Sequence, residues 1–326
     1  MNFYQISRIT ADIGIIFLML AACQQPSEEC LSIAFTGDVL LDRGVRQQIR
    51  KKGVEHLFES VTPLFRSVDA TVINLECPIT SVRSPLHKKY IFRAEPIWAT
   101  VLSQAGITHA AMANNHTIDQ GRNGLTDTNQ YLLSSGITPV GYGDTSTQSC
   151  QPVLIKKGKI EVALYNSVAL PLENWVYLEN SPGICQQPIE ELKEEITNFK
   201  RQNPKSYIVV ILHWGVEYQP LPTLVQRKGA HSLIRAGADA IIGHHPHIIQ
   251  KEEYYDGKPI FYSLGNFVFD QHKPETTQSL IVQLNFTTTE CNVQLHPVVI
   301  NPVSYTHLTL PTNREVFINH CKPELQ

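Results

Sequence analysis

Six short segments of this chain place a residue that can bind a metal ion directly after an apolar run. They are TGD at 36–38, NLE at 74–76, ANNH at 113–116, LHWG at 212–215, GHHPH at 243–247 and SLGN at 263–266. Ligands of open α/β sheets bind beyond the carboxyl ends of the strands. Carboxylate, amide and imidazole groups gathered there are what a metal or phosphate site needs. The pattern therefore predicts one polar site at one edge of a sheet.

The first segments supply hard oxygen ligands. We expect Asp38, Asn74, Glu76 and Asn115 to bind metal, because carboxylate and amide oxygens suit hard cations. Asn74 and Glu76 are two positions apart, so on a strand they would share a face. The plainer alternatives are a Gly-Asp turn at Asp38 and a polar strand end that faces water.

The later segments supply histidines. His213 follows an apolar run and is either a ligand or a core histidine. His245 and His247 alternate around Pro246, which biases the preceding residue toward an extended backbone. Both rings would then project to one side as a ligand pair, and His244 would point away or toward a substrate. A surface histidine cluster is the plainer alternative.

Four further residues are candidates for handling protons or substrate. His116 is either a ligand or a general acid, and Asp119, three residues later, could orient its imidazole. Glu217 is a candidate base, or only a charge at the rim. Asn266 ends its apolar run either as a substrate contact or as part of a simple turn.

The composition is that of a folded α/β protein. The chain has 326 residues, is 42% hydrophobic and carries a formal net charge of −3, which suits one large domain or two small ones. Lysine and arginine are dispersed without a basic stripe, so we predict no nucleic-acid partner. Apolar runs alternate with helical segments, which predicts an α/β fold with a mixed sheet.

Glycines and caps set the expected helix ends. The helices predicted at 95–106, 124–135 and 222–236 should each stop at a glycine in the left-handed conformation. Asp42 should cap a helix that runs through 47–60.

The remaining segments predict strands and loops. The stretch 141–170 indicates β-rich connecting structure, and 171–188 indicates a loop near the site. The runs at 258–264, 280–286 and 292–300 should be antiparallel strands separated by short polar turns.

The N-terminus has the pattern of a targeting segment. The apolar run at 13–22 is too short for a comfortable membrane span. It ends in LAAC at 20–23, which resembles the lipobox of bacterial lipoproteins and implies lipidation of Cys23. We therefore expect a signal peptide at 1–22 and a polar tether at 23–31. An ordinary signal peptide or a membrane anchor is the alternative.

Five other cysteines precede residue 300 and could pair in an oxidising compartment, although nothing in the sequence fixes their connectivity. They are Cys30, Cys77, Cys150, Cys185 and Cys291. The absence of CxxC spacing argues against a thiolate zinc site. We expect Cys77 to be a small buried apolar residue rather than a ligand.

The C-terminal stretch differs in origin. VSYTHLTLPT at 303–312 is the peptide that a common transposase sequencing adapter encodes. We therefore expect the natural sequence to be interrupted near Pro302 and 303–326 to be non-native. No function is assigned to His307, His320 or Cys321.

Together these segments resemble the CapA-type poly-γ-glutamate capsule-synthesis (PGA_cap) proteins, a branch of the calcineurin-like metallophosphoesterase superfamily. The resemblance spans a domain at about 32–302 and rests on matched motifs. These are GDxxL from Gly37, NLE at 74–76, NNHxxDxGxxGxxDT at 114–128, HWGxE at 213–217, GHHPH at 243–247 and SLGNFVF at 263–269. It implies a four-layer α/β/β/α sandwich of the metallo-dependent phosphatase type.

The chain departs from ordinary metallophosphoesterases in the first two motifs. Val39 and Leu40 follow Asp38 where the usual motif is Asp-x-His, and the segment 74–76 replaces the usual second aspartate. The Asn-His pair and the final His-x-His remain. Metal number, metal identity and phosphoester activity are therefore open.

The resemblance implies an extracytoplasmic, membrane-anchored lipoprotein of the cell envelope. Its partner would be an anionic polymer such as poly-γ-glutamate, in synthesis, export or release. We expect one or two divalent ions (Mn, Zn or Fe) and a metal-dependent hydrolase acting on an ester, phosphoester or amide. The alternative is a non-catalytic, polymer-binding scaffold subunit of a membrane synthase complex. A peptidase-like or sugar-phosphate activity is a third possibility.

Overall fold

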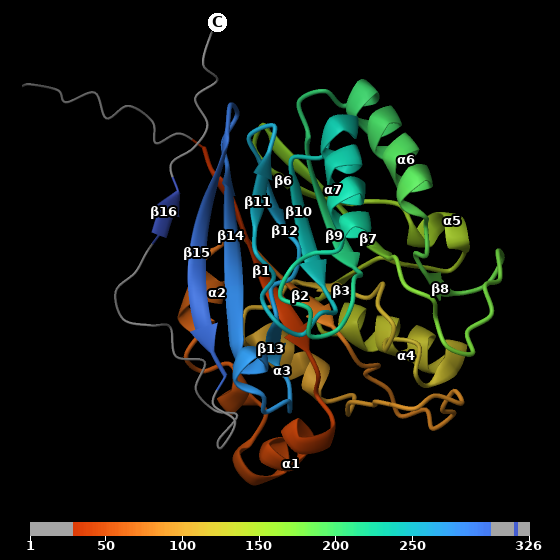
Figure 1. The fold of residues 1–326 in the computed structure, drawn as a ribbon. Coiled ribbons are helices and arrows are strands. Elements are labelled where there is room, and N and C mark those ends of the chain that lie inside the picture. Colours follow the sequence, from red (N-terminus) through yellow and green to blue (C-terminus); the bar gives the residue numbers. More distant parts are fainter. Residues whose placement is uncertain (1–28, 301–315, 319–326) are drawn as a thin grey trace, which may run out of the picture.

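The structure is a computed structural model that describes residues 29–300 and 316–318. Two β-sheets pack face to face, and helices cover the outer face of each sheet (Figure 1). This layering lets each sheet and each amphipathic helix bury its apolar side. The predicted four-layer α/β/β/α sandwich is confirmed.

The first sheet has eight strands and contains the first apolar runs of the domain. Its order is β16 (Val316–Ile318), β15 (Cys291–Val299), β14 (Gln278–Phe286), β1 (Leu31–Val39), β2 (Ala70–Leu75), β3 (His109–Ala111) and β4 (Thr138–Val140), with β13 (Asn266–Val268) paired to β1. Strands β1 to β4 are parallel, while β14 and β15 are antiparallel.

The second sheet has six strands. Its order is β11 (Glu253–Tyr255), β12 (Lys258–Phe261), β10 (Ala240–His244), β9 (Tyr207–His213), β7 (Ile160–Val168) and β6 (Val153–Lys157). The strands β12, β10, β9 and β7 are parallel, and their near-continuous apolar sequences suit strands covered on both faces. A two-stranded sheet pairs β5 (Tyr142–Gly143) with β8 (Gly183–Ile184).

The helices form the outer layers. They are α1 (Arg43–Lys52), α2 (Thr62–Ser67), α3 (Trp98–Gln104), α4 (Gly121–Ser134), α5 (Ser146–Ser149), α6 (Ile189–Gln202) and α7 (Leu224–Ala236), with 3₁₀ turns η1 (Glu55–Leu57) and η2 (Pro274–Thr277). Side chains of α1 to α4 pack on the first sheet, and those of α6 and α7 pack on the second. A third apolar core, which includes Phe35, Ile211 and Phe286, lies between the two sheets.

Strand register brings the polar segments into two rows. In the first sheet, Asp38 lies opposite Asn74 on one side and Asn266 on the other. In the second sheet, His213 lies opposite His244. The two rows meet because His244 Nε2 donates a hydrogen bond to the Thr36 carbonyl at 2.9 Å.

Two glycines allow backbones to approach closely beside these rows. A Cβ atom on Gly37 would lie 2.0 Å from the Gly265 carbonyl oxygen. A Cβ atom on Gly243 would lie 2.0 Å from the Tyr262 carbonyl oxygen and 2.7 Å from Trp214 Nε1. Neither position can hold a side chain without moving a strand that carries a predicted ligand.

Several expected boundaries are confirmed. Asp42 caps α1, and Gly106, Gly136 and Gly237 all adopt positive φ at helix ends. The helix predicted through 47–60 is wrong, because α1 ends at Lys52. Gly53 follows with φ of 88°, which turns the chain into η1.

Three expectations about strands are corrected. The stretch 141–170 is more than connecting structure, because it contains β7, which lies between β6 and β9 within the second sheet. The run 258–264 is antiparallel to β11 but parallel to β10, while the other two runs are antiparallel as expected. His245 and His247 are not extended, because their φ angles are 96° and 60°.

The expectations about both ends of the chain fall largely outside the described residues. These include the signal peptide at 1–22, the lipidated Cys23, most of the tether at 23–31 and most of the tail at 303–326. Strand β1 begins at Leu31, one residue before the expected domain start. Within 29–300 and 316–318, no helix has the length and apolar character needed to cross a membrane.

Among the five cysteines that the structure describes, two form a disulfide, Cys77 is buried, and Cys30 and Cys291 are half-buried. Cys150 and Cys185 are bonded, which links α5 to the end of β8. Cys77 is fully buried, as expected, and burial raises the pKa of its thiol far above the ordinary value.

Gly243→Ala tests the close approach beside the histidines. The new methyl group must push back the Tyr262 backbone, so we expect the free energy of unfolding to fall by about 3 kcal/mol. Gly136→Ala is the control, because it has positive φ but nothing within 4 Å and should cost about 1 kcal/mol. Denaturant unfolding measures both, and equal losses would contradict the close-packing account.

Candidate metal centre

The two rows of polar residues converge on one point between the carboxyl ends of β1, β2, β9 and β10. Ligand atoms of Asp38, Glu76 and His213 lie within 4.8 Å of one another. Ligand atoms of Glu217, His245 and His247 also lie within 4.8 Å of one another. The structure thus brings together six of the residues that the sequence singles out.

Three of the four oxygens of the Asp38 and Glu76 carboxylates lack a hydrogen bond. Asp38 and Glu76 are fully buried, yet Asp38 Oδ2 and both carboxylate oxygens of Glu76 accept no hydrogen bond. Burial, together with the charges of Asp38, Glu217 and Asp119, raises the pKa of Glu76 well above its ordinary value. Buried charges are normally paired or bound to metal, so these oxygens fit a cation.

His247 faces the carboxylates with a defined tautomer. Its Nδ1 donates to Asn266 Oδ1 at 3.0 Å, since an amide oxygen can only accept. The same Nδ1 lies 3.2 Å from Asp38 Oδ2, and Nε2 lies 3.8 Å from Glu76 Oε1. Asn266 is itself buried and donates to Gln271 and to the Thr276 carbonyl. This is how outer residues orient histidine ligands in metal sites.

Both ring nitrogens of His213 contact asparagine side chains. Its Nε2 lies 3.0 Å from Asn115 Oδ1, and its Nδ1 lies 3.3 Å from Asn74 Nδ2. The same Asn74 nitrogen donates to Asp38 Oδ1 at 2.8 Å. Burial and four nearby histidines lower the pKa of His213 well below its ordinary value, so the ring is neutral. To bind a metal ion, His213 would release one of these contacts.

The two other histidines of the motif have free nitrogens. His244 donates through Nε2 to the strand carbonyl of Thr36, and its Nδ1 has no partner. His245 Nδ1 also has no partner, and burial lowers the pKa of His245 to about 4. Both rings are therefore neutral bases, the form in which imidazole binds metal.

His116 lies at the edge of the cluster in its own network. Its Nδ1 donates to Asp119 Oδ2 at 2.8 Å, and its ring centroid lies 4.2 Å from that of Phe92. Burial lowers the pKa of His116, although the hydrogen bond to Asp119 raises it. Nε2 is therefore the atom left to exchange a proton.

The sequence does not single out the partner of Asp119. Lys88 Nζ lies 2.6 Å from Asp119 Oδ1 and 2.5 Å from the Asn115 carbonyl, and its side chain is only 4% exposed. Lysine in an irregular segment is normally exposed. Its burial here depends on Asp119, thirty-one residues away, which no local pattern reveals.

Asn114 organises the turn that carries these residues. Its Oδ1 accepts from the backbone N–H groups of His116 and Thr117, and its Nδ2 donates to the Leu75 carbonyl. The turn is thereby fixed to the end of β2. The run of two asparagines before His116 is the signal that could have identified this role.

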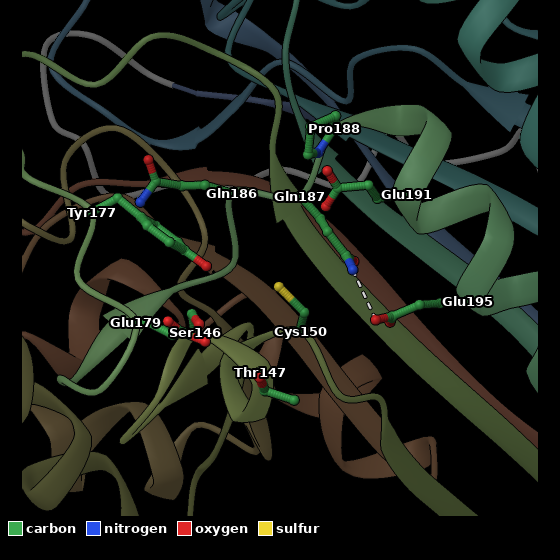
Figure 2. A pocket seen from close by; sticks show the side chains of 10 residues that line it. All are labelled: Ser146, Thr147, Cys150, Tyr177, Glu179, Gln186, Gln187, Pro188, Glu191 and Glu195. Carbon is green, nitrogen blue, oxygen red and sulfur yellow. Dashed lines mark hydrogen bonds between the residues drawn. The ribbon is translucent and has the colours of Figure 1, made fainter.

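A separate cavity of about 570 Å³ lies between α5 and α6 (Figure 2). Glu179, Glu191 and Glu195 line it together with Cys150 of the disulfide. Figure 2 shows Gln187 bonded to Glu195 across one wall. The residues that line this cavity include none of the predicted site residues.

The two-sheet fold that carries these ligand-type groups is also found in a protein of known structure. A putative 5′-nucleotidase from Staphylococcus aureus has a similar fold, with a TM-score of 0.51 and 14% identity. The similarity covers 81% of this chain and 54% of that one. The two clusters of ligand atoms suggest divalent metal binding.

Sequence comparison identifies the family. Residues 32–271 match the family of the bacterial capsule synthesis protein PGA_cap, and the chain belongs to this family. It is 32% identical over 260 residues to the "PGA biosynthesis protein CapA" of Bacillus subtilis (strain 168), which covers 79% of this chain and 68% of that protein. It is 29% identical over 272 residues to the "Capsule biosynthesis protein CapA" of Bacillus anthracis, covering 81% and 66%. The chain thus spans about two thirds of the length of these relatives.

Metal content of the His245→Ala/His247→Ala variant tests the cluster. Loss of two candidate nitrogen ligands should weaken Mn²⁺ or Zn²⁺ binding by more than about 100-fold, beyond the effect typical of removing an outer partner. Titration calorimetry and elemental analysis measure this. His231→Ala is the control, because His231 pairs with Glu253 away from the cluster. Equal metal binding by the unmodified protein, the double variant and the His231→Ala control would contradict the prediction.

Proposed function

We propose that this protein acts on poly-γ-glutamate, or a related anionic polymer, in capsule biosynthesis or export through a metal-dependent hydrolase-type site. The observation that carries the proposal is the set of fully buried Asp38 and Glu76 oxygens without hydrogen bonds beside neutral histidines. The names of the Bacillus relatives support the biological role.

The cluster would hold one or two divalent ions, with Mn, Zn and Fe as candidates. Asp38, Glu76 and His213 form one group of ligands, and Glu217, His245 and His247 form another. Asn74 and Asn115 are within reach of His213 and could add amide oxygens. When bound, the metal supplies Lewis acidity, which acidifies water and polarises an ester, phosphoester or amide oxygen.

The remaining residues would position substrate and move protons. His116 would exchange a proton with the leaving group at Nε2, while Asp119 and Lys88 hold the ring in place. Glu217 is exposed and serves as the candidate base or as a ligand. The predicted substrate contacts of His244 and Asn266 remain proposals. The side-chain amide oxygen and nitrogen of Asn266 both have hydrogen-bond partners within the protein.

A polymer-binding scaffold is the second candidate, and one observation favours it. Asn74 turns its amide nitrogen toward Asp38, whereas a carboxylate at this place would add a charged ligand. Such a subunit would use the metal only to hold a carboxylate of the polymer within a membrane synthase complex. Stoichiometric metal without turnover would separate this candidate from the hydrolase.

His116→Ala tests the proton-transfer role. We expect hydrolysis of a chromogenic ester or phosphodiester by the metal-loaded protein to fall by about 10²–10⁴-fold, because a positioned general acid contributes this much. Metal content should not change, and His231→Ala should retain full activity. Turnover by the His116→Ala variant equal to the unmodified protein would contradict the assigned role.

We also propose that Cys23 is lipidated and anchors the protein to the outer side of a membrane. The support is the LAAC sequence at 20–23. Cys23→Ala should move the protein from the membrane fraction to the soluble fraction, or leave it with an unprocessed N-terminus. Mass spectrometry of the N-terminal peptide measures this. An unmodified Cys23 in the mature protein would contradict the proposal.

A further inference from the structure

The segment 81–92 flanks the candidate metal centre and contains no acidic residue. It holds four basic residues, Arg83, His87, Lys88 and Lys89. The segment has no regular secondary structure, but hydrogen bonds hold it against the candidate metal centre. The Leu86 N–H donates to the backbone carbonyl of Asp119, while the Phe92 N–H and buried Lys88 both donate to the Asp119 carboxylate. The chain has a net negative charge, so a basic segment that is held beside the centre suggests a role in binding an anion.

The exposed part of this segment presents a cation beside an aromatic ring. Lys89 Nζ lies 5.0 Å from the ring centroid of Tyr90, whose side chain is 52% exposed. Two residues later, the Phe92 ring packs on His116. The Lys89–Tyr90 pair therefore belongs to the flank of the centre on which His116 lies.

A second pair of the same kind lies on the other flank. Lys273 Nζ lies 4.5 Å from the ring centroid of Tyr218, and that ring is 6.2 Å from the ring of His247. Gln271 fixes the phenol by donating to its oxygen at 3.0 Å. Tyr218 holds an unusual backbone, with φ of 60°, which points to a constrained position.

The two flanks face a common space. Arg43 lies between them, because its guanidinium group is 5.6 Å from the ring centroid of Phe92 and also bonds Asp270, the residue before the Gln271 that holds Tyr218. Arg43 is neutralised by Asp270 at 2.8 Å. Within the described residues, no carboxylate forms an ion pair with Lys89 or Lys273, so these two ammonium groups can receive an anion.

We infer that Lys89–Tyr90 and Tyr218–Lys273 form two carboxylate-binding subsites for one linear polycarboxylate that runs past the metal centre. This inference rests on the proposed function and assigns polymer recognition to named residues. Each γ-glutamyl unit carries one free carboxylate and two methylene groups, which match an ammonium group beside an aromatic ring. A single small anion held at the centre could not occupy both flanks, whereas a chain with repeated carboxylates can.

Binding of fluorescently labelled poly-γ-glutamate to the full-length protein in detergent tests the inference. Lys89→Ala/Lys273→Ala should weaken binding by about 5- to 10-fold at low salt, since exposed ion pairs contribute modestly. The matched control is Lys159→Ala/Lys205→Ala. These two exposed lysines precede β7 and β9, at the opposite edge of the sheet from the site, and their loss should change affinity less than twofold. Added salt should reduce the difference between the two variants.

The outcomes separate this inference from the proposed function. If the two double variants weaken binding equally, or if neither weakens it, the assignment of the subsites is wrong. This holds even if the protein hydrolyses a small ester. If the unmodified protein binds no polymer, the inference also falls. If only the Lys89→Ala/Lys273→Ala variant binds more weakly but the protein hydrolyses no substrate, the subsites are supported. The polymer-binding scaffold then replaces the hydrolase as the proposed function.

Discussion

The architecture depends on two fully buried carboxylates that the protein does not satisfy. Asp38 and Glu76 lie where the two sheets meet, and three of their four oxygens accept no hydrogen bond. An isolated buried carboxylate is costly, so the pair requires a cation or a proton nearby. Burial and the charge of Asp38 raise the pKa of Glu76, which favours its protonated form. Burial lowers the pKa of His213, His244 and His245, so these rings are neutral and available as metal ligands.

The fold supplies this arrangement by packing two mixed sheets face to face, so that the carboxyl ends of their parallel strands meet. One sheet contributes Asp38 and Asn74 in register, and the other contributes His213 and His244. Gly37 and Gly243 let neighbouring segments within each sheet approach closely beside these rows. Outer contacts, such as Asn266 with His247 and Asp119 with His116, then fix the ring orientations. Position and tautomer are thus set before any ligand arrives.

Much of this could be predicted from the sequence because the signals are local. Apolar runs followed by polar residues placed most strands, glycines marked three helix ends, and the six segments marked the residues that converge. The failures involve nonlocal effects. The extended backbone expected from Pro246 does not form, since His245 and His247 adopt positive φ. The burial of Lys88 depends on distant Asp119, and the place of β7 depends on its pairing with β9.

The central claim is that the carboxylates and histidines enclose a metal ion. Anomalous diffraction from crystals of the protein loaded with Mn²⁺ tests it most directly. The account predicts a peak within bonding distance of Asp38 and Glu76 oxygens and of at least one nitrogen among His213, His245 and His247. No peak at this point, or a peak only in the acidic cavity beside Glu179 and Glu191, would contradict it.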